Sequence, residues 1–239
     1  MRFFILLYIA ASISNIFPQS KYNLHLYLKV YLQGDYQNGK MLTTLNEKNL
    51  IPLKQPYSSS PWNYSGGEKV NAMPANVSDW ILIEFAAPDY KEKICRACLL
   101  NSNGNVSDTD GSNYVKFDNI AAGEYYVIIY HRNHLPLVTS AVLEINSDSL
   151  RLDFTKSDSV TANSLSVTDL GDGNLGMISG DGNSDGKIDK SDLMDIAKDI
   201  FKLGYYNCDL DMNGIVNVLD YERAQRNLMK KTLVKLSAN

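Results

Sequence analysis

The stretches Asp181-Gly-Asn-Ser-Asp-Gly-Lys-Ile-Asp-Lys-Ser-Asp192 and Asp209-Leu-Asp-Met-Asn-Gly-Ile-Val-Asn-Val-Leu-Asp220 share one twelve-residue pattern. In both, side chains that carry oxygen occupy positions 1, 3, 5, 9 and 12, and glycine occupies position 6. Ca²⁺ takes roughly six to eight oxygen ligands, so the chain must wrap around it, and glycine permits the sharp turn. Two such stretches in the same register predict two calcium-binding loops.

The pattern also names the expected ligands. Those of the first ion are Asp181, Asn183, Asp185, Asp189 and Asp192, with the backbone carbonyl of Lys187 at position 7. Those of the second are Asp209, Asp211, Asn213, Asn217 and Asp220, with the backbone carbonyl of Ile215. The first loop offers four carboxylates and the second three, and more anionic ligands favour tighter binding. We therefore expect the first loop to fill first.

The surroundings of the loops differ from those of an ordinary EF-hand. Position 12 is aspartate in both loops, where the usual signature has glutamate. Glycine-rich sequence precedes the first loop, and only the short stretch 204–208 precedes the second, so neither has an entering helix. Each unit is a loop followed by a helix. On these residues the segment 177–231 resembles a dockerin, a calcium-dependent module that binds a cohesin domain of another protein.

Apolar residues recur at helical spacing after each loop. They are Leu193, Ile196, Ala197, Ile200 and Phe201 after the first and Tyr221, Ala224, Leu228 and Met229 after the second. Two short helices could bury these stripes only against each other, which makes a core too small to stand alone. We therefore expect calcium to supply the missing stability.

The resemblance to dockerins implies a partner-binding face at loop positions 10 and 11 and along the following helix. In the first repeat these residues are Lys190, Ser191, Ala197, Lys198 and Lys202; in the second they are Val218, Leu219, Gln225, Arg226 and Lys230. The two faces differ, which favours one docking orientation. The alternative is that Val218 and Leu219 only cap the small core.

The N-terminal two-thirds show alternation of period two and no long helix. Expected strands cover 24–32, 80–85, 125–131, 139–145 and 149–154, the last two as a hairpin. The fold class is therefore mainly β, an antiparallel β-sandwich followed by the small α module. The stretch 115–127, with a small-residue corner closed by Gly123, resembles the carboxypeptidase-regulatory or transthyretin-like sandwich.

The N-terminal residues predict export. Met1-Arg2 followed by an apolar run to Ser12 predicts a signal peptide over 1–20, too short for a membrane span. The expected division is then a sandwich over 22–155, a polar connector over 156–176, the dockerin-like domain over 177–231 and a tail over 232–239. We expect a secreted or cell-surface protein. The net charge of -4 offers no basic face for nucleic acid.

No catalytic residue is predicted. Cys95 and Cys98 are expected to pack as small residues in a strand rather than to form a disulfide or a zinc site, and Cys208 has no assigned role. His131 and His134 are expected to face opposite ways on a strand end, in a structural role. The loop aromatics Tyr57, Trp62 and Tyr64 either form a small core of their own, which we favour, or stack on a ligand such as a sugar.

Three functions remain open at this stage. The first is a non-catalytic exported protein tethered to a cohesin-bearing partner by its dockerin-like module. The second is a carbohydrate-active or sugar-binding component of a polysaccharide-degrading complex. The third is a calcium-stiffened cap with no docking partner.

Overall fold

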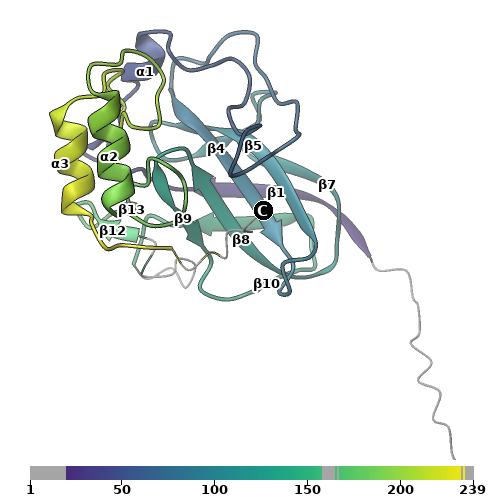
Figure 1. Ribbon diagram of the computed structural model, residues 1–239. Helices are drawn as coiled ribbons and strands as arrows, with labels where there is room; N and C mark the ends of the chain where they lie inside the picture. The colour runs from purple at the N-terminus through teal and green to yellow at the C-terminus, as the bar shows by residue number, and fades with distance from the viewer. Residues whose placement is uncertain (1–19, 158–164, 166, 233, 235–239) are drawn as a thin grey trace, which may run out of the picture.

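The computed structural model describes residues 20–157, 165, 167–232 and 234 (Figure 1). All of the predicted signal peptide except Ser20, and most of the tail 232–239, lie outside these residues. Within the described part of the chain no helix is long and apolar enough to cross a membrane.

Two β-sheets make up most of the structure. The smaller sheet has the strand order β11 (Ser149–Asp153), β1 (Lys21–Lys29), β7 (Val115–Ala121). The larger has the order β10 (Leu143–Ile145), β8 (Gly123–His131), β4 (Val77–Ala86), β5 (Lys93–Asn101), β6 (Val106–Ser107), with β9 (His134–Val138) also paired to β8. The chain is mainly β, and the two sheets fit the predicted sandwich.

The alternation of β1 explains how the sheets meet. Leu24, Leu26 and Leu28 are buried, while the residues between them are partly exposed. Since successive side chains of a strand point to opposite faces, one face of β1 enters the core. Across the core, Phe85 of β4 meets Phe117 of β7 edge to face, with ring centroids 4.8 Å apart. The core therefore lies between the two sheets.

The predicted corner at Gly123 is confirmed. β7 belongs to the smaller sheet and β8 to the larger, so the chain changes sheets at Ala122. Gly123 has a φ of 148°, a conformation that side chains resist.

The predicted hairpin over 139–154 is wrong. β10 pairs with β8 in the larger sheet, whereas β11 pairs with β1 in the smaller one. The turn between them crosses the sandwich, and Asp148 ties it to β1 by accepting hydrogen bonds from the backbone N–H groups of Asn23 (3.0 Å) and His25 (2.9 Å). The β1–β11 pairing is parallel, so the sandwich is not purely antiparallel.

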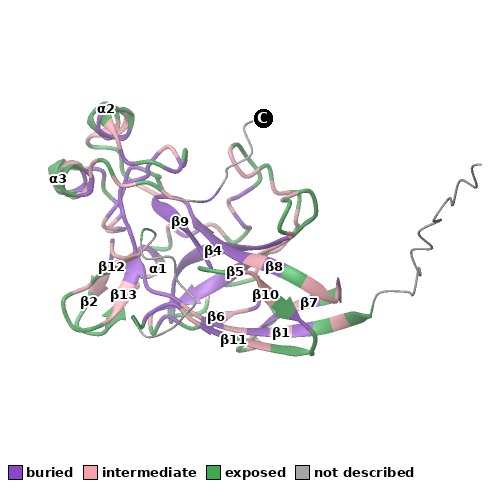
Figure 2. Ribbon diagram, turned by 90° about the horizontal axis from the view of Figure 1, so that it is seen from below, coloured by how far each residue is buried: buried purple, intermediate pink, exposed green. Residues whose placement is uncertain are grey.

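The larger sheet is covered on its outer side by the segment 44–75, which contains α1 (Thr44–Glu47). Every residue of β4 is consequently buried (Figure 2). The Tyr57 hydroxyl donates to the carbonyl of Trp80 (2.7 Å), and Trp62 meets the Tyr57 ring edge to face at 5.0 Å. The loop aromatics pack inward, but not as a core of their own: Tyr57 lies in the main core, and Trp62 and Tyr64 pack against it. Cys95 and Cys98 are free thiols on β5, as expected.

The connector is partly structured. β12 (Val167–Asp169) and β13 (Leu175–Met177) form a hairpin, and a second small ribbon, β2 (Tyr36–Gln37) with β3 (Lys40–Met41), lies near it. Met177 exchanges backbone hydrogen bonds with Tyr31 (2.8 Å) and Gln33 (3.0 Å). The connector therefore lies on the sandwich and leads directly to α2 (Lys190–Asp199) and α3 (Val218–Arg226), which pack side by side at one end of it (Figure 1).

Candidate functional site

The first twelve-residue loop is shaped by its first and last aspartates, both fully buried. Asp181 accepts hydrogen bonds from the backbone N–H groups of Asp185 and Gly186, both at 3.0 Å. Asp192 accepts three more, from the N–H groups at positions 2, 3 and 9, at 3.0, 3.3 and 2.9 Å. Two side chains thus hold the loop closed, with Gly186 at a φ of 84° in the turn.

The second loop repeats these bonds position by position. Asp209 accepts from the N–H groups of Asn213 (3.1 Å) and Gly214 (2.8 Å). Asp220 accepts from positions 2, 3 and 9 at 2.7, 3.1 and 2.8 Å. Asp209 and Asp220 are again fully buried. The two loops have few residues in common but therefore adopt the same backbone conformation.

Position 9 of each loop also starts the helix that follows. Asp189 accepts from the backbone N–H of Ser191 (2.8 Å), and Asn217 accepts from that of Leu219 (2.8 Å). With the position 12 aspartate bonding back to the position 9 N–H, each helix begins in a capping box. Loop and helix are a single unit, as the sequence predicts.

The closed loops concentrate negative charge. Burial, with the nearby Asp192 charge, raises the pKa of Asp181 well above its usual value. Burial raises the pKa of Asp209 to about 7, and it also raises the pKa values of Asp192 and Asp220. Buried carboxylates that repel each other are stabilised by a cation placed between them.

The residues fit calcium. Oxygen atoms of Asp209, Asp211 and Asp220 lie within 4.8 Å of one another, the one group of three acidic, His or Cys ligand atoms this close among the described residues. Two oxygens bound to one Ca²⁺ at about 2.4 Å can be at most about 5 Å apart. In the first loop position 3 is an amide, and Asp185 pairs with Lys187 at 3.3 Å. The donor set in both loops is all oxygen, which suits a hard cation.

The two repeats are joined by a reciprocal exchange of backbone hydrogen bonds. The Ile188 N–H donates to the carbonyl of Lys230, and the Val216 N–H donates to that of Lys202, both at 2.9 Å. Each loop thus pairs with the segment that follows the other repeat's helix. The result is an approximate twofold relation between the repeats, with Ile188 and Val216 both fully buried.

The helices do not bury their apolar residues only against each other, as the sequence had suggested. Leu193, Ile196, Val216 and Ala224 do form a shared cluster. The loop residue Ile188, however, packs with Leu135 of β9 and with Ile178, and Met212 joins the main core. The module is therefore built onto the sandwich rather than standing alone.

The turn between β8 and β9 makes the junction. The side-chain amide of Asn133 donates to the carbonyl of Asp209 (2.7 Å), and the Ser184 hydroxyl donates to the carbonyl of Arg132 (3.0 Å). Arg132 is itself buried: its Nε donates to Asp79 (3.0 Å), and its Nη1 donates to the carbonyl of Tyr206. One turn of the sandwich thus touches both calcium-type loops.

The same turn corrects the prediction for the histidines. His131 and His134 do not face apart, because the chain reverses between them and brings their Nδ1 atoms to 3.0 Å. His134 Nε2 accepts from the Gly34 N–H (3.0 Å), and His131 Nε2 lies 3.2 Å from Asp79. Burial lowers the pKa of both imidazoles. Their role is structural, as expected, but by a different geometry.

The predicted partner-binding face is open to solvent. Nine of its ten residues are exposed and Lys230 is half-buried; the exposed ones are Lys190, Ser191, Ala197, Lys198, Lys202, Val218, Leu219, Gln225 and Arg226. Val218 and Leu219 are 59 % and 55 % exposed, so they do not cap the core.

Sequence reasoning missed several apolar residues on this surface. Phe201 and Met229, expected in the helical stripes, are 84 % and 87 % exposed. The helices end at Asp199 and Arg226, and both residues lie beyond them with φ near 70° (73° and 70°). Met194, Leu203 and Ile215 are exposed as well. Helical spacing was the misleading signal, since it continued past the true helix ends.

Comparisons with known proteins assign the chain to no family. No protein-family model and no curated protein matches the chain. The solved structures that resemble it include an N-terminal and a C-terminal interface mutant of a type II cohesin–X-dockerin complex from Acetivibrio cellulolyticus. The identities are 17 % and 16 %, the TM-scores 0.44 and 0.45, and the matches cover 86 % and 87 % of this chain and 97 % of each matched chain. Likeness at this level carries no argument about family or function.

Proposed function

We propose that this is an exported calcium-binding protein whose C-terminal loop–helix pair docks a non-catalytic β-sandwich onto a partner protein of the cohesin type. The observation that carries the proposal is the duplicated cradle. In each loop a buried aspartate at position 1 and another at position 12 organise the backbone around an all-oxygen donor set.

Calcium supports the proposal by its effect on these loops. An ion between the position 1 and position 12 carboxylates would relieve their repulsion. It would also stabilise the folded form alone, by RT ln(1 + [L]/Kd). We infer two ions, one per loop, held by the residues at positions 1, 3, 5, 7, 9 and 12.

Docking is supported by the surface of the module. Of the ten large apolar residues exposed in the described chain, eight lie between 194 and 229. Val218 and Leu219 stand between two expected ligands, Asn217 and Asp220, so an ion in the second loop would orient both. Phe201 donates a backbone hydrogen bond to Val216, and Leu203 bridges Ile215, so these exposed residues lie close to the second loop. Clustered exposed apolar residues mark protein interaction surfaces.

The same observation favours docking over a purely structural cap. A cap would bury its apolar residues or replace them by polar ones, because exposing them gains nothing in water. Leu203 and Ile215, which face each other in a backbone bridge, are instead 70 % and 37 % exposed. We define these two residues with Phe201, Val218 and Leu219 as the apolar docking face.

The test is partner capture with the full mature chain, residues 21–239, because the module is built onto the sandwich. The chain is passed over a panel of immobilised cohesin domains in about 2 mM CaCl₂, roughly a thousandfold excess over a micromolar Kd, and again in excess EGTA. Binding that needs calcium supports the proposal. Absence of capture by every cohesin, with calcium bound and the chain folded, contradicts docking. The matched control is Leu53→Ala, an exposed apolar residue of the sandwich.

A further inference from the structure

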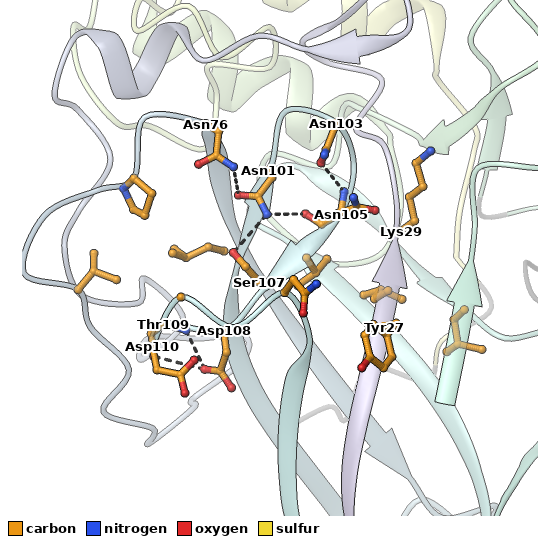
Figure 3. A pocket seen from close by; sticks show the side chains of 18 of the residues that line it. Tyr27, Lys29, Asn76, Asn101, Asn103, Asn105, Ser107, Asp108, Thr109 and Asp110 are labelled. Atoms are coloured by element: carbon orange, nitrogen blue, oxygen red, sulfur yellow. Dashed lines mark hydrogen bonds between the residues drawn. The ribbon is translucent and has the colours of Figure 1, made fainter. Parts of the chain in front are cut away.

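A large polar cleft lies on the sandwich, away from both calcium-type loops. Its volume is about 1040 Å³, at the upper end of the range of ligand sites. One wall is strand β1 with Tyr27 and Lys29, and the other is formed by the end of β5, strand β6 and the turns at 103–113 (Figure 3). No residue of the docking face lines it.

Asparagine dominates the lining. Six asparagines line the cleft: Asn71, Asn76, Asn101, Asn103, Asn105 and Asn113. An amide side chain offers two donors and one acceptor with no net charge. The lining therefore favours a ligand rich in hydroxyl groups, which donate and accept in the same way.

Part of this lining is held rigid by the protein itself. The Asn76 amide donates to the side-chain oxygen of Asn101 (2.9 Å), and the Asn101 amide donates to the Asn105 carbonyl (3.0 Å) and the Ser107 hydroxyl (3.2 Å). Figure 3 shows these residues as one hydrogen-bonded row facing β1. A fixed polar floor lowers the ordering cost of binding.

Other amides are left available. Within the part of the chain that the structure describes, no hydrogen bond joins the side chains of Asn71 and Asn113 to another protein group, and both are exposed. On the opposite wall the Tyr27 hydroxyl likewise has no protein partner among the described residues. The Tyr27 ring is held in place by Arg151, whose guanidinium lies 3.9 Å from the ring centroid. Donors, acceptors and an aromatic edge thus surround the open space.

The charges of the cleft argue against an ionic ligand. Two of its acids are already paired, Asp108 with Arg96 (2.8 Å) and Asp110 with Lys116 (2.6 Å). Lys29 and Arg151 stand on the wall that also carries Asp153. Neither sign dominates, so electrostatics would not select an anion or a cation.

From this lining we infer that the cleft binds a neutral oligosaccharide, with sugar hydroxyls on the asparagine amides and on the Tyr27 hydroxyl. A peptide is the weaker alternative. The neighbouring edge strand β6 has only two residues, too few for a backbone ladder with an extended chain. The inference is independent of the calcium loops and would stand if they bound no ion.

The test is titration calorimetry of the mature chain with cellohexaose, xylohexaose and mannohexaose, in calcium throughout. We expect at least one to bind. The double variant Asn71→Ala/Asn113→Ala should weaken that binding about tenfold, as expected for the loss of two modest hydrogen bonds, and Tyr27→Phe by about fivefold. Asn146→Ala, an exposed asparagine in the β10–β11 turn, is the matched control and should bind as the unchanged chain does.

Thermal melting verifies that all variants remain folded. Four results would overturn the inference. They are no binding of any of the three sugars at about 10 mM, binding unchanged by the double variant, preference for the anionic hexagalacturonate, and tighter binding of a serine–threonine hexapeptide.

Discussion

The first repeat, residues 181–204, and the second, residues 209–232, have the same loop backbone, but the exposed loop side chains are polar in the first and apolar in the second. Their loops share bonds and even the left-handed residues Ser184 and Met212, with φ of 59° and 57°. Loop positions 7, 10 and 11 differ, however: the first repeat has lysine, lysine and serine there, and the second has isoleucine, valine and leucine. The aspartates at positions 1 and 12 fix the backbone by their hydrogen bonds, whereas side chains that point to solvent are free to differ. The difference predicts one preferred docking face.

The second repeat is also the one held more closely by the sandwich. Asn133 donates to Asp209, and the Lys48 ammonium donates to the carbonyl of Asn213 (2.6 Å). A Cβ on Gly214 would come within 2.6 Å of Leu50. The repeat with the more apolar exposed surface is therefore the one that the sandwich holds more firmly in place.

The largest effect should follow from breaking the junction. Arg132→Ala leaves Asp79 buried without its main counter-charge, and removing one member of a buried ion pair costs about 3–5 kcal/mol. We expect the free energy of unfolding in urea to fall by that amount. Arg226→Ala, which removes an exposed pair with Glu222, should change it by less than about 0.5 kcal/mol. Equal effects would mean that the junction does not hold the second repeat.

Removing calcium tests whether both repeats depend on a bound ion for their stability. At a hundredfold excess of ion over Kd each site adds about 2.7 kcal/mol, so excess EGTA should lower the melting temperature of the full chain. Mg²⁺ should restore little of this, since it demands a tighter octahedral geometry. A melting temperature indifferent to EGTA would remove the calcium hypothesis for both loops.

Replacing the exposed residues at loop positions 10 and 11 tests whether the difference between the two repeats decides partner binding. Val218→Ala with Leu219→Ala should weaken partner binding about thirtyfold, or roughly 2 kcal/mol, as for central apolar anchors. The equivalent change in the first repeat, Lys190→Ala with Ser191→Ala, should cost less than about threefold. Surface plasmon resonance measures both against one cohesin. The reverse order would assign docking to the first repeat.

The first repeat, which should contribute less to partner binding, should bind calcium more tightly than the second. Asp209→Ala leaves only the first loop intact, and Asp181→Ala leaves only the second. Because the first loop has one more carboxylate, calorimetry should find its calcium affinity about tenfold higher. Its Asp185–Lys187 pair works against this, so Lys187→Ala should widen the gap. Equal affinities would show that charge count does not decide the order of filling.

The smallest effect is a pH dependence at the junction. Burial lowers the pKa of His131 and His134, so the stability that their neutral forms provide is complete above about pH 6.5 and is lost as pH falls below it. The slope is at most about 1.4 kcal/mol per pH unit for each histidine. Asp35, whose burial raises its pKa to about 7, opposes this trend, because its protonation on acidification favours the folded form.

The measurement therefore uses Asp35→Asn with calcium in excess. Urea unfolding between pH 8 and 5 should show constant stability down to about 6.5 and a decline below it. A flat profile to pH 5 would mean that the histidine pair does not hold the turn.

Much of the fold was predictable from local pattern. The strands at β1, β4 and β8, the corner at Gly123 and a helix after each loop all follow from short-range rules of alternation and turn chemistry. The hairpin over 139–154 failed because alternation does not say which sheet a strand joins. Phe201 and Met229 were misplaced because an apolar residue in helical register need not lie within the helix.

By itself the sequence determined the two acidic loops, since the spacing of aspartate and glycine over twelve residues is enough to close each loop by hydrogen bonds from its own backbone. It also determined the class of the larger domain, because period-two alternation is a local property of strands. Tertiary structure alone decided that the β8–β9 turn touches both loops, that the chain reverses there and brings the two histidines together, and that asparagines from three segments share one cleft with β1. These depend on how strands and turns pack against one another, which no local spacing records.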